Sequence, residues 1–166
     1  MTTGAAVALG LVLLLLRSTL FPLLGFAAIG PDLAFPLVVF YGVRGRFVDG
    51  VILALVLGYL ADLMAGGPQG FHLFHYMLGF ALAQLVSGRV ALHGLAIPAA
   101  MVFAFDLVGG TVLALLYGAW GEPIPRPAGG LLLGAALTAL FSLPLIPVLR
   151  TLERVTRKKE KLSWIE

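Results

Sequence analysis

The sequence predicts an all-α protein, a polytopic membrane bundle of six transmembrane helices with both termini in the cytoplasm. Composition, the length of the apolar segments and the distribution of basic residues lead to this prediction. The chain of 166 residues is 60% hydrophobic and 11% charged, and its mean hydropathy is +1.04. A soluble domain has about 25% charged residues, so this composition indicates an integral membrane protein. No polar block is long enough to form a separate soluble domain.

Glycine, proline and charged residues divide the chain into six apolar segments. The expected helices cover residues 5–26, 32–43, 47–65, 71–88, 95–118 and 129–149. The boundaries are set by Gly30-Pro31-Asp32, Arg44-Gly45-Arg46, Gly66–Gly70, Ser87-Gly88-Arg89 and residues 121–127. A span needs about 20 residues, and the second segment is shorter and contains Pro36. If that segment is re-entrant or strongly tilted, the number of spans falls from six to five.

The basic residues predict the orientation. Nine of the 11 fall on one side of the expected bundle: Arg44, Arg46, Arg89, Arg150, Arg154, Arg157, Lys158, Lys159 and Lys161. Arg126 is on the other side, and Arg17 is inside the first span. The positive-inside rule therefore places both termini in the cytoplasm of a multi-pass protein of the cell inner membrane.

The chain divides into a transmembrane bundle, residues 1–149, and a basic cytoplasmic tail, residues 150–166. The tail has a net charge of +3, which equals that of the whole chain, so the high pI does not indicate a nucleic-acid-binding surface. A partial apolar stripe accompanies the charges of Arg157, Lys158, Lys159 and Lys161. This pattern is typical of a short helix on anionic membrane lipids or on a cytoplasmic partner. The alternative is an ordinary positive-inside anchor.

Asp62 lies near the end of the third apolar segment, before a predicted periplasmic turn that contains Gly67, Pro68 and Gly70. A charge inside a span costs at least ~2.5–3.5 kcal/mol on insertion scales, so it needs a partner, an aqueous cavity or a function. Small residues lie four positions apart on the same helix face, at Gly50, Ala54, Gly58 and Gly66, with Asp62 itself between the last two. Small residues at this spacing allow another helix to approach closely. We therefore expect Asp62 to face a protein interface.

Three charged residues lie within predicted spans: Arg17, Asp62 and Asp106. At ~1.5 Å per helical residue, they lie about 18, 22 and 16 Å from the cytoplasmic ends of their helices. An arginine between two carboxylates would reduce the desolvation cost of each. The favoured interpretation is a buried charge cluster that fixes helix register. A proton or substrate site and independent contacts with water remain the alternatives.

The sequence predicts no catalytic, cofactor-binding or metal site. His72 and His75 share a helix face, and Asp62 is a conceivable third ligand, but zinc usually takes three or four protein ligands. Hydrogen bonding by these histidines is the favoured interpretation. The turn at Gly66–Gly70 lacks the Lys-Ser/Thr of a phosphate-binding loop, and no Gly-x-Ser-x-Gly nucleophile motif is present. We therefore expect a protein that is not an enzyme.

The chain resembles the rod shape-determining protein MreD family over nearly its full length. Three segments carry the resemblance: Arg17-Ser18-Thr19-Leu20-Phe21-Pro22, the stretch from Pro31-Asp32-Leu33 to Tyr41-Gly42-Val43-Arg44-Gly45-Arg46, and Gly58-Tyr59-Leu60-Ala61-Asp62-Leu63-Met64-Ala65-Gly66-Gly67-Pro68-Gln69-Gly70. The order and spacing of the three segments indicate the family more specifically than any single segment does. Arg17 departs from the family pattern, in which a neutral polar residue, commonly Gln, is expected before Ser-Thr.

The resemblance implies a non-enzymatic inner-membrane scaffold of the cell-elongation machinery. Such proteins bind MreC, and with it they link MreB filaments to peptidoglycan synthesis by RodA and its penicillin-binding transpeptidase. The family is also distantly similar to the six-helix substrate-binding subunits of energy-coupling-factor vitamin transporters, which supplies an alternative function. A scaffold should have a packed interior, whereas a binder should have an outward-facing pocket with several polar groups.

Overall fold

The computed structural model describes residues 3–23, 30–44, 46–65, 69–89, 94–121 and 128–162, with side chains described as far as 153 in the last range. Six helices account for nearly all of this part of the chain: α1 (Thr3–Leu23), α2 (Phe35–Val43), α3 (Phe47–Ala65), α4 (Phe71–Val86), α5 (Ala96–Ala119) and α6 (Ala128–Leu162). Four of them, α1, α3, α5 and the Ala128–Glu153 part of α6, are long and apolar enough to cross a membrane. The predicted all-α membrane bundle is confirmed.

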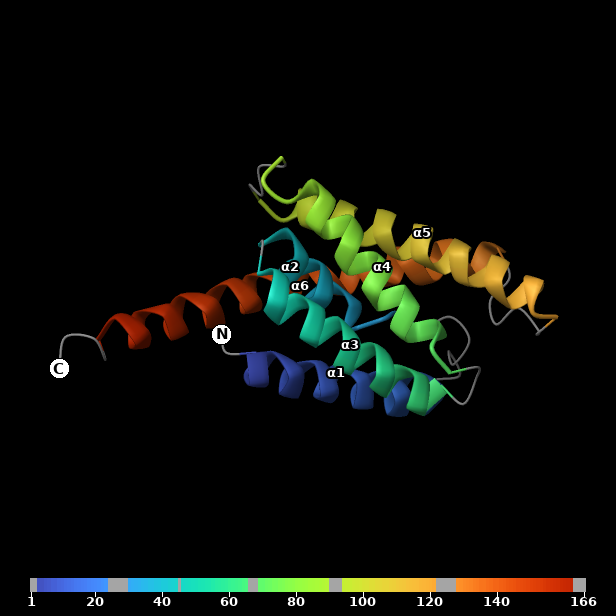
Figure 1. The fold of residues 1–166 in the computed structure, drawn as a ribbon, viewed down its shortest axis with the longest axis horizontal. Coiled ribbons are helices and arrows are strands. Elements are labelled where there is room, and N and C mark those ends of the chain that lie inside the picture. Colours follow the sequence, from blue (N-terminus) through green and yellow to red (C-terminus); the bar gives the residue numbers. More distant parts are fainter. Residues whose placement is uncertain are drawn as a thin grey trace.

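Contacts between distant segments bring both chain termini to one end of the bundle. The Thr3 hydroxyl donates a hydrogen bond to the Asp49 carboxylate, which places the start of α1 beside the start of α3. Arg44, which follows α2, forms a salt bridge of 3.1 Å with Glu153 of α6. We call this the basic end, and the opposite end, where α3 passes into α4, the distal end (Figure 1). By the positive-inside rule, we expect the basic end to lie in the cytoplasm.

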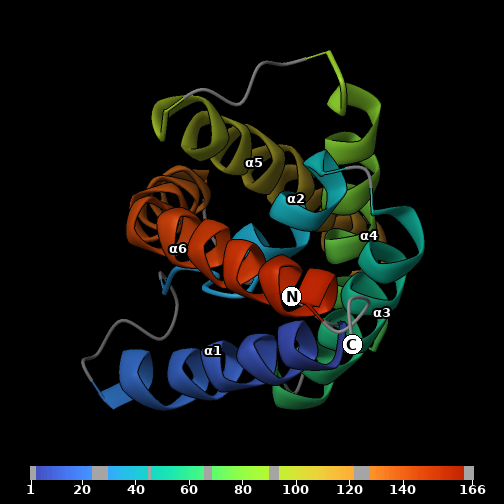
Figure 2. The ribbon, with the colours of Figure 1, turned by 90° about the vertical axis from the view of Figure 1, so that its left-hand side faces the viewer.

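The short helix α2 occupies the centre of the bundle. Its nine residues extend about 13.5 Å, less than half of the ~30 Å bilayer core. All of them except Phe40 are buried, and α2 packs against α3, α4, α5 and α6 (Figure 2). The segment expected at 32–43 is therefore a half-length helix surrounded by protein. Pro36 fits here because a proline in the first turn removes no intrahelical hydrogen bond.

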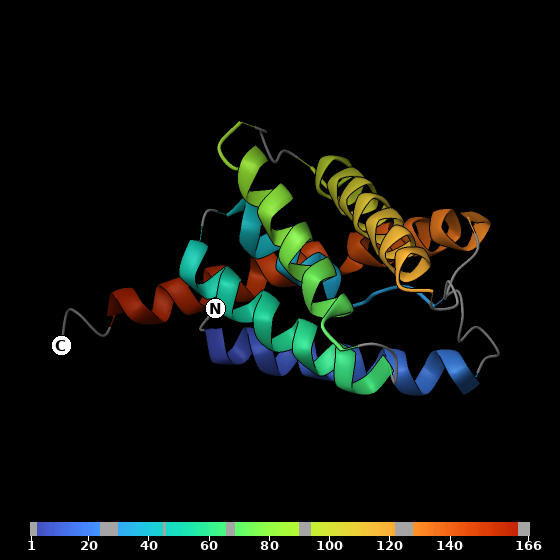
Figure 3. The same ribbon diagram turned by 45° about the vertical axis from the view of Figure 1, so that its right-hand side comes forward.

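The small-residue face of α3 packs against α4 of the same chain (Figure 3). A Cβ atom on Gly58 would lie 2.6 Å from the Leu73 Cα, and one on Gly50 would lie 2.2 Å from the Phe80 ring. Ala54, between them, is fully buried. The prediction of a helix-packing face thus describes an internal hairpin at these positions. Gly66, Gly67 and Pro68 lie outside the described residues.

Helix α6 continues without interruption from the bundle into the basic tail, as far as Leu162. The predicted helix end at 149 is therefore wrong. Pro144 and Pro147 are the last strong helix breakers, and the following Lys, Arg, Glu and Leu residues favour helix. The 35 residues extend about 52 Å, well beyond the ~30 Å bilayer core. Figure 1 shows α6 extending past the other helices at the basic end.

Candidate functional site

The carboxylate of Asp32, just before α2, accepts hydrogen bonds from three segments. Its Oδ2 accepts from Arg17 Nη1 of α1 at 2.9 Å, and its Oδ1 accepts from the Tyr76 hydroxyl of α4 at 2.7 Å. Oδ1 also lies 3.2 Å from the backbone nitrogens of Ala34 and Phe35, so Asp32 caps the start of α2. With only 4% of its surface exposed, Asp32 is a buried anion with four donors. Such a group tolerates burial because every donor compensates for lost hydration.

A further bond connects Asp32 to α6. The backbone N–H of Asp32 donates to the Thr138 hydroxyl at 2.9 Å, and that hydroxyl donates to the Gly134 carbonyl within α6. Asp32 therefore joins α1, α2, α4 and α6 at one point in the interior. We call Arg17, Asp32, Tyr76 and Thr138 the Asp32 network.

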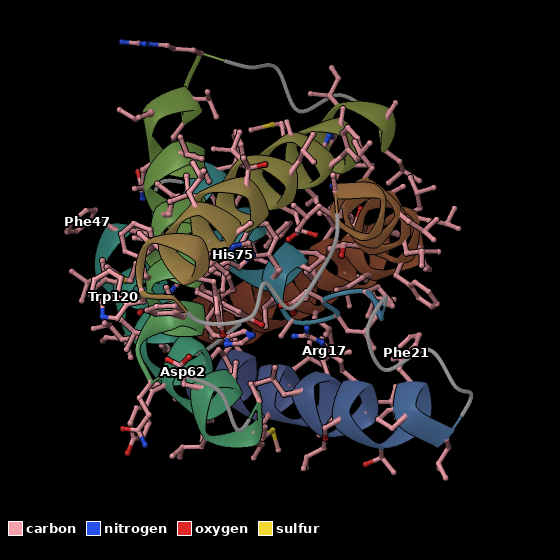
Figure 4. All side chains as sticks on the ribbon, turned by 90° about the vertical axis from the view of Figure 1, so that its right-hand side faces the viewer. Arg17, Phe21, Phe47, Asp62, His75 and Trp120 are labelled. Atoms are coloured by element: carbon pink, nitrogen blue, oxygen red, sulfur yellow. The ribbon has the colours of Figure 1, made fainter. Side chains whose placement is uncertain are left out.

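The expected direct cluster of Arg17, Asp62 and Asp106 is not formed. Arg17 pairs with Asp32, which was expected at the start of the second span and not as a partner of Arg17. Because α2 is short, the segment before it reaches into the bundle and brings Asp32 closer to Arg17 than either predicted partner. In Figure 4, Arg17 points from α1 towards the interior, and Asp62 and His75 lie on other helices.

Asp62 closes the turn between α3 and α4 from inside the bundle. Its carboxylate accepts hydrogen bonds from the backbone N–H groups of Gly70, His72 and Leu73, at 2.7–3.1 Å. The ring Nδ1 of His72 lies 3.2 Å from Asp62 Oδ1. These N–H groups belong to the first turn of α4, which has no internal acceptors for them and carries partial positive charge. The expectation that Asp62 is packed and paired is confirmed, although its partners belong to the helix N-terminus.

Asp62→Lys should reduce the amount of folded protein far more than Asp62→Asn. Asparagine keeps one acceptor oxygen for the α4 turn, whereas lysine removes every acceptor and adds a like charge at a positive helix end. The stability of the Asp62→Leu variant should lie between those of the other two, because leucine leaves the three N–H groups without an acceptor but adds no charge. The measurement is membrane abundance and the thermal midpoint of the purified variants. Equal midpoints for the lysine and asparagine variants would contradict the capping role.

A second buried pair, His75 and Asp106, joins α4 to α5. His75 Nε2 lies 3.1 Å from Asp106 Oδ1, and the His75 ring stacks on Phe35 of α2 with centroids 4.7 Å apart. Gly109 allows this approach, since a Cβ there would lie 2.4 Å from His75 Nδ1. His75 Nδ1 and Asp106 Oδ2 are buried and have no hydrogen-bond partner within the described part of the chain. Asp106 therefore holds α5 against α4 and does not contact Arg17.

These contacts suit the positioning of helices better than bond-making chemistry. Each buried carboxylate is engaged by an arginine, a histidine or a helix N-terminus. Among the described residues, no group of three or more His, Asp or Glu side chains could hold a metal ion. His72 and His75 contact different carboxylates. The arrangement fixes the relative depth of α1, α2, α4, α5 and α6.

Asp32, Tyr76 and Thr138 are site residues that were not predicted from the sequence. A signal for Asp32 was present, because Asp shortly before an apolar run, with Pro36 near its start, is typical of a helix N-terminus. No sequence signal marked Tyr76 or Thr138. Tyrosine and threonine occur in spans for many reasons, and only the packing of α4 and α6 around α2 brings their hydroxyl groups to Asp32.

Comparison with known proteins gives no assignment: no family model, no curated protein and no solved structure matches this chain.

Proposed function

We propose that this chain is a non-enzymatic scaffold of the bacterial elongation machinery, similar in role to MreD proteins. In this role it sits in the cell inner membrane as a multi-pass protein and binds MreC. Through MreC it couples MreB filaments to peptidoglycan synthesis by RodA and its penicillin-binding transpeptidase, and so to rod shape.

One observation carries the proposal: two of the three segments on which the MreD resemblance rests meet in a salt bridge inside the bundle, and the third caps the helix that also binds this pair. Arg17 of the first segment forms a salt bridge with Asp32 of the second. Asp62 of the third segment caps α4, the helix whose Tyr76 also binds Asp32. Segments that define a shared fold are expected to contact one another in this way. This pattern supports a resemblance of architecture.

The use of the interior polar groups supports a scaffold more than an enzyme. Asp32, Asp62 and Asp106 each accept hydrogen bonds or ion pairs from another segment. A scaffold needs a bundle of fixed shape that presents constant surfaces to its partners. The extension of α6 supplies one such surface, because a continuous helix carries Arg157, Lys158, Lys159 and Lys161 away from the bundle.

Affinity purification from mildly solubilised membranes, followed by mass spectrometry, tests the proposal. MreC should be enriched with the tagged chain, together with RodA or its transpeptidase. An unrelated six-span protein of the same host, expressed at the same level, controls for carry-over of abundant membrane proteins. Enrichment of an ATPase coupling module in place of the elongation proteins would overturn the scaffold assignment.

Replacing Arg157, Lys158, Lys159 and Lys161 with Gln should weaken contact with MreB filaments, or with another acidic partner, and give rounder cells. Each basic residue near an anionic surface contributes about 1 kcal/mol, so the loss should be several kcal/mol. The spans should still insert, because five other basic residues remain on that side. The measurements are cell width and MreB recovery with membranes.

The control variant exchanges lysine and arginine at the same four positions, which keeps the charge. It should behave as the parent does. If the Gln variant also maintains normal rods and normal MreB recovery, the tail is only a positive-inside anchor.

A substrate-binding subunit of an energy-coupling-factor transporter is the second candidate. One observation favours it: a cavity of about 120 Å³ near the distal end is lined by Arg17, Ser18 and His72 as well as by apolar side chains. A pocket of this kind is expected of a small-molecule binder. The purification experiment separates the two functions.

A further inference from the structure

The cavity near the distal end lies between α1, α3 and the start of α4. Its described lining includes Arg17, Phe21, Pro22, Met64, Ala65 and His72. A site for a single water needs at least about 10–15 Å³ of such volume, so 120 Å³ accommodates a small organic molecule. Figure 4 views the bundle with Arg17 and Phe21 both on the α1 side of this region.

Arg17 has hydrogen-bonding capacity left in the cavity. Among the described residues its one hydrogen bond is from Nη1 to Asp32, although a guanidinium carries five N–H donors in a planar fork. Its side chain is 21% exposed, and Arg17 lines the cavity. Asp32 also accepts from Tyr76 and two backbone N–H groups, so its charge does not depend on Arg17 alone. The guanidinium can therefore engage a second anion.

The remaining polar lining has no carboxylate among the described residues. His72 lines the cavity, and because its Nδ1 donates to the Asp62 carboxylate, its Nε2 is an acceptor, so among the described lining side chains Arg17 is the donor for an anion. The Asp62 carboxylate instead accepts hydrogen bonds from backbone N–H groups at the start of α4. A cavity lined by a guanidinium with unused donors, with the nearby carboxylates engaged elsewhere, favours an anionic group over a cation.

The other walls are apolar. Phe21, Pro22 and Met64 stand beside the polar residues and offer contact to a hydrocarbon chain or ring. A phosphate or sulfate ion has no apolar portion to pack against these walls. A ligand that carries both an anionic group and an apolar portion would use both.

We propose that this cavity is a binding site for an amphipathic anion, with its carboxylate or phosphate group on Arg17 and its apolar portion against Phe21, Pro22 and Met64. The inference goes beyond the scaffold function and does not depend on it, because it concerns a ligand and no protein partner. Two sources supply this chemistry: a water-soluble organic anion and an anionic membrane lipid.

The test uses the purified full-length chain in a neutral detergent, with octanoate as probe and 1-octanol as the uncharged probe of the same chain length. Octanoate should raise the thermal midpoint by about 5 °C at saturation, and octanol should not. Arg17→Lys keeps a positive charge beside Asp32 but removes the planar fork, so it should weaken octanoate binding about tenfold.

Ala65→Phe fills the cavity without changing charge, and it should abolish the octanoate effect. The matched control is Ala119→Phe, at another exposed position near the end of a helix, α5, which should keep the full effect. If Ala65→Phe fails to fold, Met64→Trp fills the same cavity. The proposal is overturned if octanol stabilises as well as octanoate does, or if the cavity-filling variant responds like the control.

Native mass spectrometry after exchange into phosphatidylglycerol distinguishes the two sources. A phosphatidylglycerol molecule that octanoate displaces, and that Ala65→Phe no longer retains, identifies a lipid in the site. An octanoate response without a displaceable lipid identifies a soluble anion. Because these readouts require no partner, their failure leaves MreC binding unaffected, and loss of MreC binding leaves them unaffected.

Discussion

Replacing Asp32 with Ala should remove nearly all folded protein from the membrane. The substitution leaves the partly buried Arg17 guanidinium without its counter-ion and the Tyr76 hydroxyl without its acceptor. Breaking a buried ion pair by removing one partner costs about 3–5 kcal/mol. The first two N–H groups of α2 also lose their cap, for about a further 1 kcal/mol. The measurement is monodisperse protein after detergent extraction, with its thermal midpoint.

Two variants separate charge from shape at this position. Asp32→Asn keeps an oxygen for Tyr76 and the α2 cap but no charge for Arg17, so its midpoint should fall between those of the parent and Asp32→Ala. Combining Asp32→Asn with Arg17→Met removes both charges and should recover part of the loss, because no unpaired ion stays buried. A double variant less stable than Asp32→Asn alone would show that the ion pair is not what Asp32 contributes.

Gly58→Leu should disrupt the α3–α4 hairpin and with it the whole bundle. A Cβ at this position would lie 2.6 Å from the backbone Cα of Leu73 and 3.3 Å from its nitrogen. Backbone cannot rotate away as a side chain can, so the two helices must move apart. Overpacking typically costs 1–3 kcal/mol, and the loss of packing around Asp62 adds to this. We expect little folded protein and a midpoint lowered by several degrees.

Gly118→Leu is the matched control, because it is the same change in another long helix. Among the described residues, no atom lies within 4 Å of a Cβ at Gly118. This variant should insert and fold as the parent does, since leucine has a higher helix propensity than glycine. If Gly58→Leu were as stable as Gly118→Leu, the close α3–α4 packing would be contradicted. If it were stable but lost MreC, the glycine face would belong to a partner interface.

The hairpin changes the interpretation of the small-residue face. From sequence alone, Gly50, Ala54 and Gly58 indicate only that another helix approaches α3. The structure identifies that helix as α4, which is joined to α3 by a short turn and therefore packs beside it at little entropic cost. A general loss of folded protein is thus the first effect expected of substitutions on this face.

The sequence determined the class of fold and most helix limits. Apolar segments long enough to span a bilayer, separated by Gly, Pro and charged residues, locate α3, α4 and α5 to within two residues of their observed ends. These signals are local, because burial in lipid requires each span to satisfy its own backbone. The sequence did not predict the end of α6. The first charged residues mark where a span leaves the membrane, and a helix can continue beyond that point.

Tertiary structure decided which charges meet. The sequence showed that Arg17, Asp62 and Asp106 are costly inside a membrane and need partners, but it did not identify those partners. The depth of Asp32 depends on the short length of α2. Tyr76 and His75 reach different carboxylates because neighbouring residues of a helix point in directions about 100° apart. Pairing inside a bundle depends on distances of a few ångströms between helices far apart in the chain, and no local pattern encodes them.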